Sequence, residues 1–340
     1  MSNFLNKKNN YKKYVVDSKL RYFKPHATKV EKSFAEEITS SLTQNSKFIN
    51  PKFFYDKKGS DLFELICLLP EYYLTRTEIS ILKNFQSSIS LYVDMNTNLV
   101  ELGSGSSVKT RLILDILTKL QPKTEYFPID ISEILTESSE QLLNDYDTLH
   151  ITGIVDSYEG GLEFLKNYDD KKNLILFLGS SFGNFTPDIG KLFLDNIFST
   201  MKSGDLFLIG LDLVKDNNIL ESAYDDSQGI TSKFNLNVLS RINDELDADF
   251  NIDNFSHYSL YNETEQRIEM NLRSLVSQSV IIGKSNMSLN FNQDELIHTE
   301  YSHKYHISQI EKLLIDVGFE IKNMWLDDKK YFSLTLVSKN

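Results

Sequence analysis

Cysteine, histidine and long apolar segments are scarce in this sequence of 340 residues. The one cysteine excludes an internal disulfide and a cysteine-based zinc site, and none of the six histidines stands in an HExxH or comparable ligand spacing. The longest apolar runs, such as residues 174–179, fall far below the roughly 20 residues that a membrane helix requires. We therefore expect a protein with no bound metal and no membrane-spanning segment.

Basic residues are also in the minority, with 36 Lys and Arg against 48 Asp and Glu and a net charge of −12. Such a balance disfavours nucleic acid as the main partner, because a phosphate backbone needs a basic face. The hydrophobic fraction of 41% and the charged fraction of 25% are typical of a soluble globular protein. We expect a cytoplasmic monomer that binds neither nucleic acid nor a membrane.

Charge is unevenly distributed along the chain. The first 30 residues contain eight basic residues and one acidic residue, Asp17. A secretory signal would need an apolar core of about 7–15 residues after its charges, and residues 11–16 are too short and too polar a segment for that role. We interpret residues 1–24 as a basic N-terminal arm, either mobile or docked on the rest of the protein.

Short apolar segments alternate with segments of helical periodicity between residues 77 and 213. Residues 174–178 are continuously apolar, as expected of a parallel strand that is covered on both faces. The alternation predicts an α/β domain with a Rossmann-like, doubly wound sheet. The expected strands are residues 99–102, 125–129, 151–155, 174–178 and 205–211.

The alternation stops after residue 213, where residues 218–246 are expected to be largely helical. Residues 307–317 have an amphipathic helical pattern again. The expected antiparallel strands are 258–261, 267–280 and 287–291, and a hairpin is expected at 319–325 and 330–337. We therefore divide the chain into an α/β domain of residues 77–213 and 305–340 and a second, α+β domain of residues 25–76 and 214–304.

A glycine-rich loop follows the first expected strand of the α/β domain, with the sequence ELGSGSS at residues 101–107. Gly103 and Gly105 would let backbone N–H groups approach a ligand where a Cβ atom would clash. The third glycine of the dinucleotide fingerprint is missing, because residue 108 is Val, and this disfavours an NAD-dependent dehydrogenase. An acid at the start of the loop, Glu101, suits S-adenosylmethionine (SAM), which carries a sulfonium and an ammonium group.

Two further acids end the next two expected strands. Asp130 could accept hydrogen bonds from both ribose hydroxyls of SAM, and Asp156 could meet its adenine amino group. The carboxyl ends of parallel strands lie at one edge of a sheet, so the three acids would face the same ligand. The alternative that Asp130 and Asp156 only cap the following helices stays open.

Several motifs follow one another in order from about residue 50 to the C-terminus. They are YDKKGSDLF at residues 55–63, LPEYYLTR at 69–76, ELGSGSSVKTR at 101–111, LGSSFGN at 178–184, AYDD at 223–226, RIEM at 267–270 and EYS at 300–302. In sequence and spacing they resemble the L-histidine Nα-methyltransferases, the SAM-dependent enzymes that open the ergothioneine pathway. The resemblance implies a class I methyltransferase fold and three successive methyl transfers to free L-histidine, which give Nα,Nα,Nα-trimethylhistidine (hercynine).

The resemblance also implies roles for individual residues. Asn184 and Tyr224 would hold the α-amino and carboxylate groups of histidine, and with Tyr55 they are the expected catalytic residues. Glu300 and Ser302 would face the imidazole. The remaining expected substrate-binding residues are Phe63, Gly179, Thr231 and Met270, and the expected cofactor-binding residues are Tyr72, Glu101, Gly103, Gly105, Lys109, Asp130, Asp156 and Ser157.

The chemistry of methyl transfer is compatible with these residue types. The enzyme must align donor and acceptor, exclude water and accept a neutral amine, whose ordinary pKa is about 8. An Asn amide and Tyr hydroxyls can anchor such an amine without holding it protonated. Glu300 and Ser302 stand two residues apart, so on an extended segment they point to the same face and could bind the two imidazole nitrogens.

The sequence is compatible with two other functions. The same scaffold could methylate the α-amino group of another amino acid, such as a tryptophan derivative. The chain could also be a non-catalytic SAM-binding module that docks onto a partner enzyme.

Overall fold

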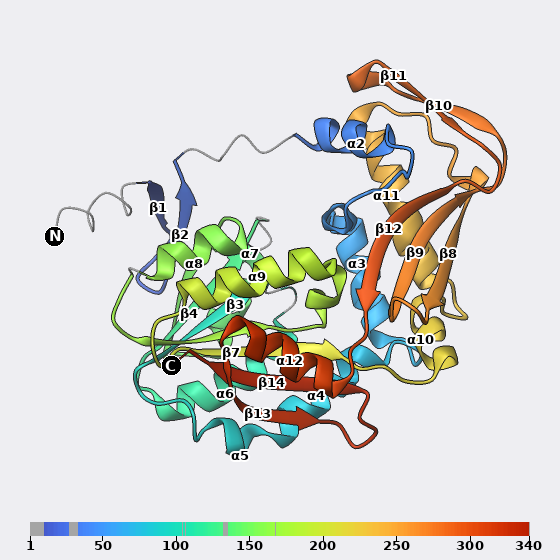
Figure 1. The fold of residues 1–340 in the computed structure, drawn as a ribbon. Helices are drawn as coiled ribbons and strands as arrows, with labels where there is room; N and C mark the ends of the chain where they lie inside the picture. The colour runs from blue at the N-terminus through green and yellow to red at the C-terminus, as the bar shows by residue number, and fades with distance from the viewer. Residues whose placement is uncertain are drawn as a thin grey trace.

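The computed structural model describes residues 10–26, 33–103, 105, 107–131, 135–166 and 168–339. Two units lie side by side in it (Figure 1). One is an α/β unit built on a nine-stranded sheet, and the other is an α+β unit that contains a three-stranded sheet and a separate hairpin. The first nine residues of the predicted basic arm lie outside the described residues.

The strands of the large sheet are arranged in the order β1-β2-β5-β4-β3-β6-β7-β14-β13. The six central strands, from β2 to β7 in this order, run parallel to one another. The outer strands pair in antiparallel fashion, β1 with β2, β14 with β7, and β13 with β14. Strand order reverses at β3, and in such sheets ligands bind at the carboxyl ends of the strands beside this point. The strands are β1 (Tyr11–Val15), β2 (Leu20–Pro25), β3 (Thr97–Leu102), β4 (Thr124–Asp130), β5 (Leu149–Val155), β6 (Lys172–Phe177), β7 (Leu206–Asp212), β13 (Glu320–Leu326) and β14 (Phe332–Ser338).

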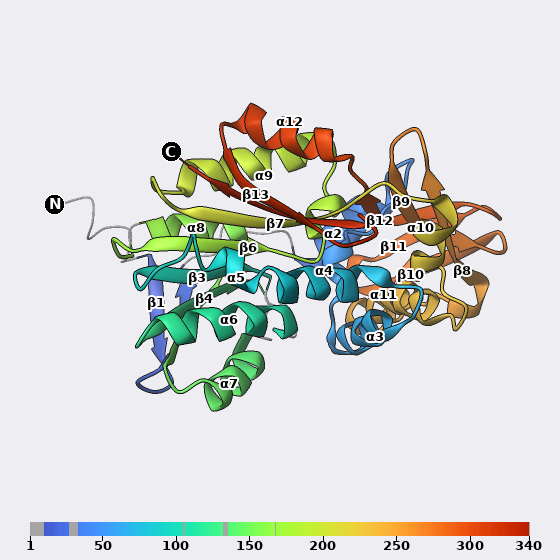
Figure 2. The ribbon, with the colours of Figure 1, turned by 90° about the horizontal axis from the view of Figure 1, so that it is seen from below.

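Helices cover both faces of this sheet, which explains why its central strands are apolar on both sides (Figure 2). One buried cluster joins the sheet to α4 (Tyr73–Asn84), α5 (Gln86–Ile89), α6 (Val108–Leu120) and α7 (Leu135–Asp145). A second cluster joins the other face to α8 (Tyr158–Lys166), α9 (Pro187–Thr200) and α12 (Ile307–Val317). The doubly wound α/β fold expected from the sequence is confirmed, including its five central strands and its C-terminal hairpin.

The N-terminal segment extends the large sheet. From residue 10 onwards the predicted arm forms the hairpin of β1 and β2, and β2 pairs in parallel with β5. Leu20 and Tyr22 point to the buried side of the sheet, with exposed fractions of 1% and 6%. These two apolar side chains, two residues apart on a strand, give the basic segment a face that can pack against the domain.

The α+β unit combines segments from before and after the central strands of the α/β unit. Its core contains α3, α11, β9 and β12, and its residues come from 38–74 and 220–297. The elements are α2 (Phe34–Leu42), η1 (Pro51–Phe54), α3 (Lys57–Leu68), α10 (Asn217–Tyr224), α11 (Ile230–Leu246), η3 (Ile252–Asn254), β8 (Phe255–Asn262), β9 (Arg267–Ser274), β10 (Gln278–Ile282), η4 (Gly283–Ser285), β11 (Met287–Phe291) and β12 (Leu296–His303).

One predicted strand of this unit is wrong. Residues 267–280 do not form a single long strand, because pairing with β12 ends at Arg273 and pairing with β8 ends at Ser274. The chain then turns, with the Ser274 hydroxyl donating to the Val276 carbonyl over 2.8 Å, and continues as β10 in a separate hairpin with β11. Among the described residues, no helix is both long enough and apolar enough to cross a bilayer.

Candidate active site

A cavity of about 60 Å³ lies where the two units meet. Its walls come from α3, α10, α11, β9 and β12 of the α+β unit and from the loop that follows β6 of the α/β unit. All substrate-binding and catalytic residues expected from the sequence line it, and so does Tyr72, which was expected at the cofactor. The residues in question are Tyr55, Phe63, Tyr72, Gly179, Asn184, Tyr224, Thr231, Met270, Glu300 and Ser302.

Asn184 reaches the cavity because the loop after β6 packs directly on β12. The short helix η2 (Ser181–Asn184) ends in Asn184. A Cβ atom at Gly183 would lie 2.9 Å from the carbonyl oxygen of His303, so only glycine allows this approach. The loop is also held by α4, because the carboxylate oxygens of Glu78 on this helix accept the Gly179 N–H over 3.0 Å. Glu78 was not predicted as part of the site.

Glu300 and Ser302 enter the cavity from β12, immediately after an irregularity in the strand. The pairing register with β9 shifts between His298 and Glu300, and the intervening Thr299 hydroxyl donates to the Met270 carbonyl over 3.0 Å. A β-bulge of this kind re-aims the side chains that follow it. As expected from their spacing, the two side chains then face the same cavity.

The carboxylate of Glu300 has no hydrogen bond or ion pair with any residue that the structure describes. Burial raises its pKa to about 7, and the nearby Lys304 ammonium opposes that rise. A carboxylate that is partly withdrawn from solvent into a small cavity, and that has no protein partner, is costly unless water or a ligand supplies one. Glu300 is therefore placed to accept a hydrogen bond from a bound molecule.

The raised pKa of Glu300 predicts a pH dependence of stability in the absence of substrate. Between the ordinary value of 4.5 and about 7, the folded protein keeps a proton that the unfolded chain has lost. The free energy of unfolding should therefore fall as the pH rises through this window and level off above it. Compared with Glu300→Gln, the wild type should lose about 1–3 kcal/mol between pH 4 and pH 8 in urea unfolding. Parallel pH profiles for the two proteins would contradict the burial of this carboxyl group.

Aromatic rings form one wall of the cavity. Phe63 meets Tyr55 edge-on with ring centroids 5.7 Å apart and meets Tyr72 at 6.2 Å, and Tyr72 in turn meets Tyr224 at 6.1 Å. Neither the Tyr55 nor the Tyr72 hydroxyl bonds to another described residue. This wall therefore offers ring faces and edges together with free hydroxyl groups to a small polar ligand.

A buried charge cluster, which was not predicted, lies behind Tyr224 and Ser302. Lys304 and Asp212 are fully buried and their charged groups lie 2.8 Å apart. Lys215 also pairs with Asp212 over 2.6 Å, and the Tyr73 hydroxyl donates to the same carboxylate. Lys304 stands two residues after Ser302 in the sequence, and this spacing is the one sequence signal that could have indicated the place of Lys304 in the cluster.

Most of the expected cofactor residues lie at the carboxyl ends of β3, β4 and β5, whereas Tyr72 lines the cavity and Lys109 lies on α6. Gly103 has a φ of 76°, in the left-handed region that favours glycine, and a Cβ atom there would also lie 2.8 Å from the Tyr158 hydroxyl. Asp130 is the last residue of β4, and Asp156 follows the last residue of β5. The Asp156 N–H donates to the Asp130 carbonyl over 3.1 Å. A loop whose glycines carry no side chain, flanked by two carboxylates, suits a ligand with a diol and an amino group.

Several of the expected cofactor residues already bond to other groups of the protein, among them Glu101 and Lys109. Glu101 accepts hydrogen bonds from Thr110 over 2.7 Å and from Tyr126 over 2.5 Å, and burial raises its pKa to about 7. Lys109 pairs with the buried carboxylate of Glu78 over 2.5 Å. Because Glu78 also holds Gly179, this pair links the helix after the glycine-rich loop to the cavity between the two units.

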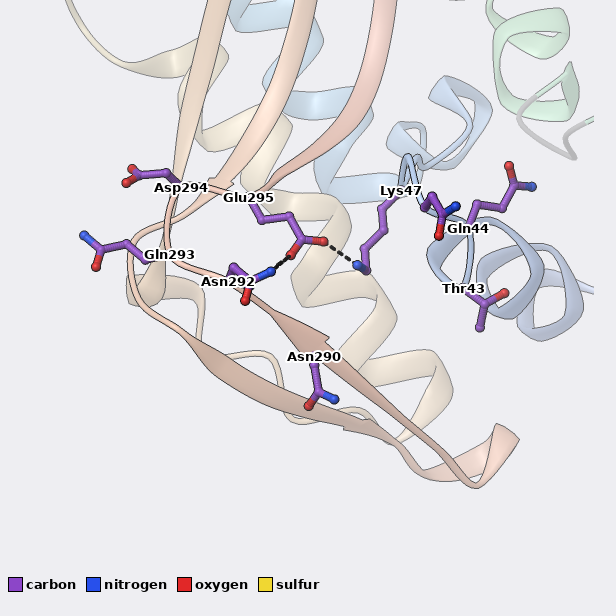
Figure 3. A pocket seen from close by; sticks show the side chains of 9 residues that line it. Thr43, Gln44, Lys47, Asn290, Asn292, Gln293, Asp294 and Glu295 are labelled. Carbon is purple, nitrogen blue, oxygen red and sulfur yellow. Dashed lines mark hydrogen bonds and ion pairs between the residues drawn. The ribbon is translucent and has the colours of Figure 1, made fainter.

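A second hollow, of about 560 Å³, lies far from these residues, beside the β10–β11 hairpin and the end of α2 (Figure 3). Its lining is polar, and Lys47 and Glu295 pair with each other across it. Asn292 donates to the same glutamate over 3.4 Å. Small-molecule sites are usually lined by apolar walls with a few convergent polar groups, so we assign no ligand to this hollow.

Comparison with known proteins agrees with the geometry. A family model described as "Histidine-specific methyltransferase, SAM-dependent" matches residues 34–339. Histidine N-alpha-methyltransferase of Mycolicibacterium smegmatis is 36% identical over 91% of this chain and 96% of that protein.

Two fungal proteins are more distant relatives. Ergothioneine biosynthesis protein 1 of Neurospora crassa is 28% identical over 92% of this chain and 36% of that protein. 4-Dimethylallyltryptophan N-methyltransferase of Claviceps purpurea is 25% identical over 88% of this chain and 93% of that protein. Since the family model covers nearly all of the sequence, the chain belongs to the histidine-specific, SAM-dependent methyltransferases.

Proposed function

We propose that this enzyme transfers three methyl groups from SAM to the α-amino nitrogen of L-histidine, giving hercynine, the first step of ergothioneine biosynthesis. The observation that carries the proposal is the unpartnered Glu300 carboxylate beside the Ser302 hydroxyl in a small cavity. An imidazole can donate one N–H to the carboxylate and accept at its other nitrogen from the hydroxyl. An indole offers a single N–H and no acceptor nitrogen, so it could bond to the carboxylate but not accept from the hydroxyl.

The cofactor would lie across the carboxyl ends of β3, β4 and β5. Gly103 and Gly105 would admit its methionine part, Asp130 would accept from the ribose hydroxyls, and Asp156 with Ser157 would meet the adenine. When bound, SAM supplies an electrophilic methyl group on a positively charged sulfur. Glu101 and the Glu78–Lys109 pair would hold the loop and the helix that carry this site.

The residues around the amine position it without protonating it. Asn184 and the hydroxyls of Tyr55 and Tyr224 are neutral groups that can orient the amine and the carboxylate of the substrate. With the wall of Phe63 and Tyr72 they exclude water from the reacting atoms. The trimethylated product carries a permanent positive charge, and the neighbouring aromatic rings can stabilise it by about 0.5–2 kcal/mol.

The test is a mass-spectrometric screen of the purified enzyme with SAM and each of the 20 standard amino acids. Histidine alone is expected to gain three methyl groups, with one and two as intermediates. Methylation of tryptophan in preference to histidine would support the other amino-acid specificity, and binding of S-adenosylhomocysteine without any methylated product would support a non-catalytic module. The cytoplasmic location and the monomeric state stay predictions from the sequence.

The N-terminal hairpin provides a prediction about cofactor affinity. The Tyr11 hydroxyl on β1 donates to the Asp156 carboxylate and lies 3.1 Å from the Gly160 carbonyl oxygen. If Asp156 receives the adenine amino group, Tyr11→Phe should raise the Kd for S-adenosylhomocysteine about tenfold, because a hydrogen bond to a charged group is lost. Calorimetry measures this. Tyr14→Phe, an exposed position on the same strand, is the control, and equal affinities for both variants would contradict the role of Asp156.

A further inference from the structure

Lys304 makes three polar contacts, one for each hydrogen of its ammonium group. Its Nζ lies 2.8 Å from Asp212 Oδ2, 3.0 Å from the Tyr224 hydroxyl and 2.8 Å from Ser302 Oγ. The side chain is fully buried, so it does not reach the cavity itself. Because an ammonium group can only donate, both hydroxyl oxygens must accept from it.

The two hydroxyls also bond to each other. The Tyr224 and Ser302 oxygens lie 2.7 Å apart, and one of their two hydrogens must occupy this contact. The other hydrogen is then the only one that the pair can offer to a ligand. Because Lys304 donates to both oxygens from the Asp212 side, the remaining hydrogen cannot point toward Asp212 and is turned to the cavity.

The chemistry of the proposed reaction selects one of the two arrangements. An imidazole has an ordinary pKa of about 6.5 and an α-amino group one of about 8, so a substrate with a neutral amine also has a neutral ring. A neutral ring needs one acceptor and one donor. Glu300 is the acceptor, and Ser302 must be the donor. Tyr224 then donates to Ser302 and keeps a lone pair for the substrate amine.

We propose that Lys304 is a positioning residue for substrate recognition, which acts through Tyr224 and Ser302 by keeping their one remaining hydrogen directed to the cavity. The inference rests on the proposed function, because it takes histidine as the ligand. It adds a specificity element that touches no substrate atom. The counter-charge that holds the buried Lys304 in place comes from Asp212, at the end of β7, so a residue of the α/β unit supports a wall of the site in the α+β unit.

The chain contains a matched control. Lys215 pairs with the same Asp212 carboxylate and is also buried, but it contacts Tyr73 and the Leu213 carbonyl in place of Tyr224 and Ser302. Lys304→Met and Lys215→Met each remove one ammonium group from Asp212. A purely structural role therefore predicts similar behaviour of the two variants.

The experiment is calorimetric titration of histidine into the complex of each protein with S-adenosylhomocysteine. Lys304→Met should raise the Kd for histidine about 10- to 100-fold, whereas Lys215→Met should change it by less than about threefold. The Kd for S-adenosylhomocysteine should stay the same in both. Lys304→Gln, whose amide keeps N–H donors, should recover part of the histidine affinity and serves in place of Lys304→Met if that variant does not fold.

Equal losses of histidine affinity in Lys304→Met and Lys215→Met would overturn the inference and leave Lys304 a structural residue. Unchanged affinity in Lys304→Met would overturn it as well. A wild-type protein that does not bind histidine would instead contradict the proposed function, so the two failures are distinguishable.

Discussion

Replacement of Glu300 by alanine is expected to lower kcat/KM for histidine by about 10²–10³-fold, while the Kd for S-adenosylhomocysteine stays unchanged. The bound imidazole would lose its acceptor, and its N–H would be left buried without a partner. Such a loss affects every step that depends on substrate position, so it should appear in KM and in kcat together. Steady-state kinetics with SAM and histidine measure it.

A matched control for this variant is Glu265→Ala, at the exposed turn between β8 and β9, which should behave as wild type. A Glu300→Ala enzyme that kept full activity and its preference for histidine would remove the basis for the imidazole contact. A variant that lost histidine and gained an apolar amino acid would agree with it, because the cavity would then have a small apolar wall in place of a carboxylate.

Replacement of Asp212 by asparagine is expected to lower the free energy of unfolding by about 3–5 kcal/mol, because it leaves two ammonium groups without their shared counter-charge. Lys304 and Lys215 both depend on this carboxylate, and neither is more than 4% exposed. Urea unfolding followed by circular dichroism measures the loss.

The control for Asp212 is Asp328→Asn, in the exposed turn between β13 and β14, which should stay within about 0.5 kcal/mol of wild type. An Asp212→Asn protein as stable as the control would show that the two lysines lose their protons at little cost. Together with the histidine affinity of the same variant, the result separates the stabilising role of Asp212 from its effect on Lys304.

The α/β unit could be predicted from the sequence because its signals are local. Continuous apolar strands such as residues 174–178, and Thr186-Pro187-Asp188 at the start of α9, determine element types without reference to the rest of the chain. The division of residues 267–280 into β9 and β10 was missed because it depends on where β8 and β12 stop pairing. The docking of the N-terminal hairpin depends similarly on a free edge at β5.

The candidate site also contains one part that could be predicted from the sequence and one part that could not. The residues that line the cavity were expected from motifs, whereas the parts that support them depend on tertiary contacts. The ion pair of Glu78 with Lys109 joins residues 31 positions apart in sequence, and Lys304 meets an aspartate 92 positions earlier. No periodicity or spacing connects such residues. The bulge at Thr299 is likewise set by the pairing of β12 with β9.

The most direct test of the account is a crystal structure of the enzyme with S-adenosylhomocysteine and histidine. We predict that the imidazole lies between Glu300 and Ser302 within hydrogen-bond distance of both, and that the α-amino nitrogen points to the cofactor sulfur past Asn184 and Tyr224. A histidine bound with its imidazole against the sulfur, or with Glu300 turned to solvent, would contradict it.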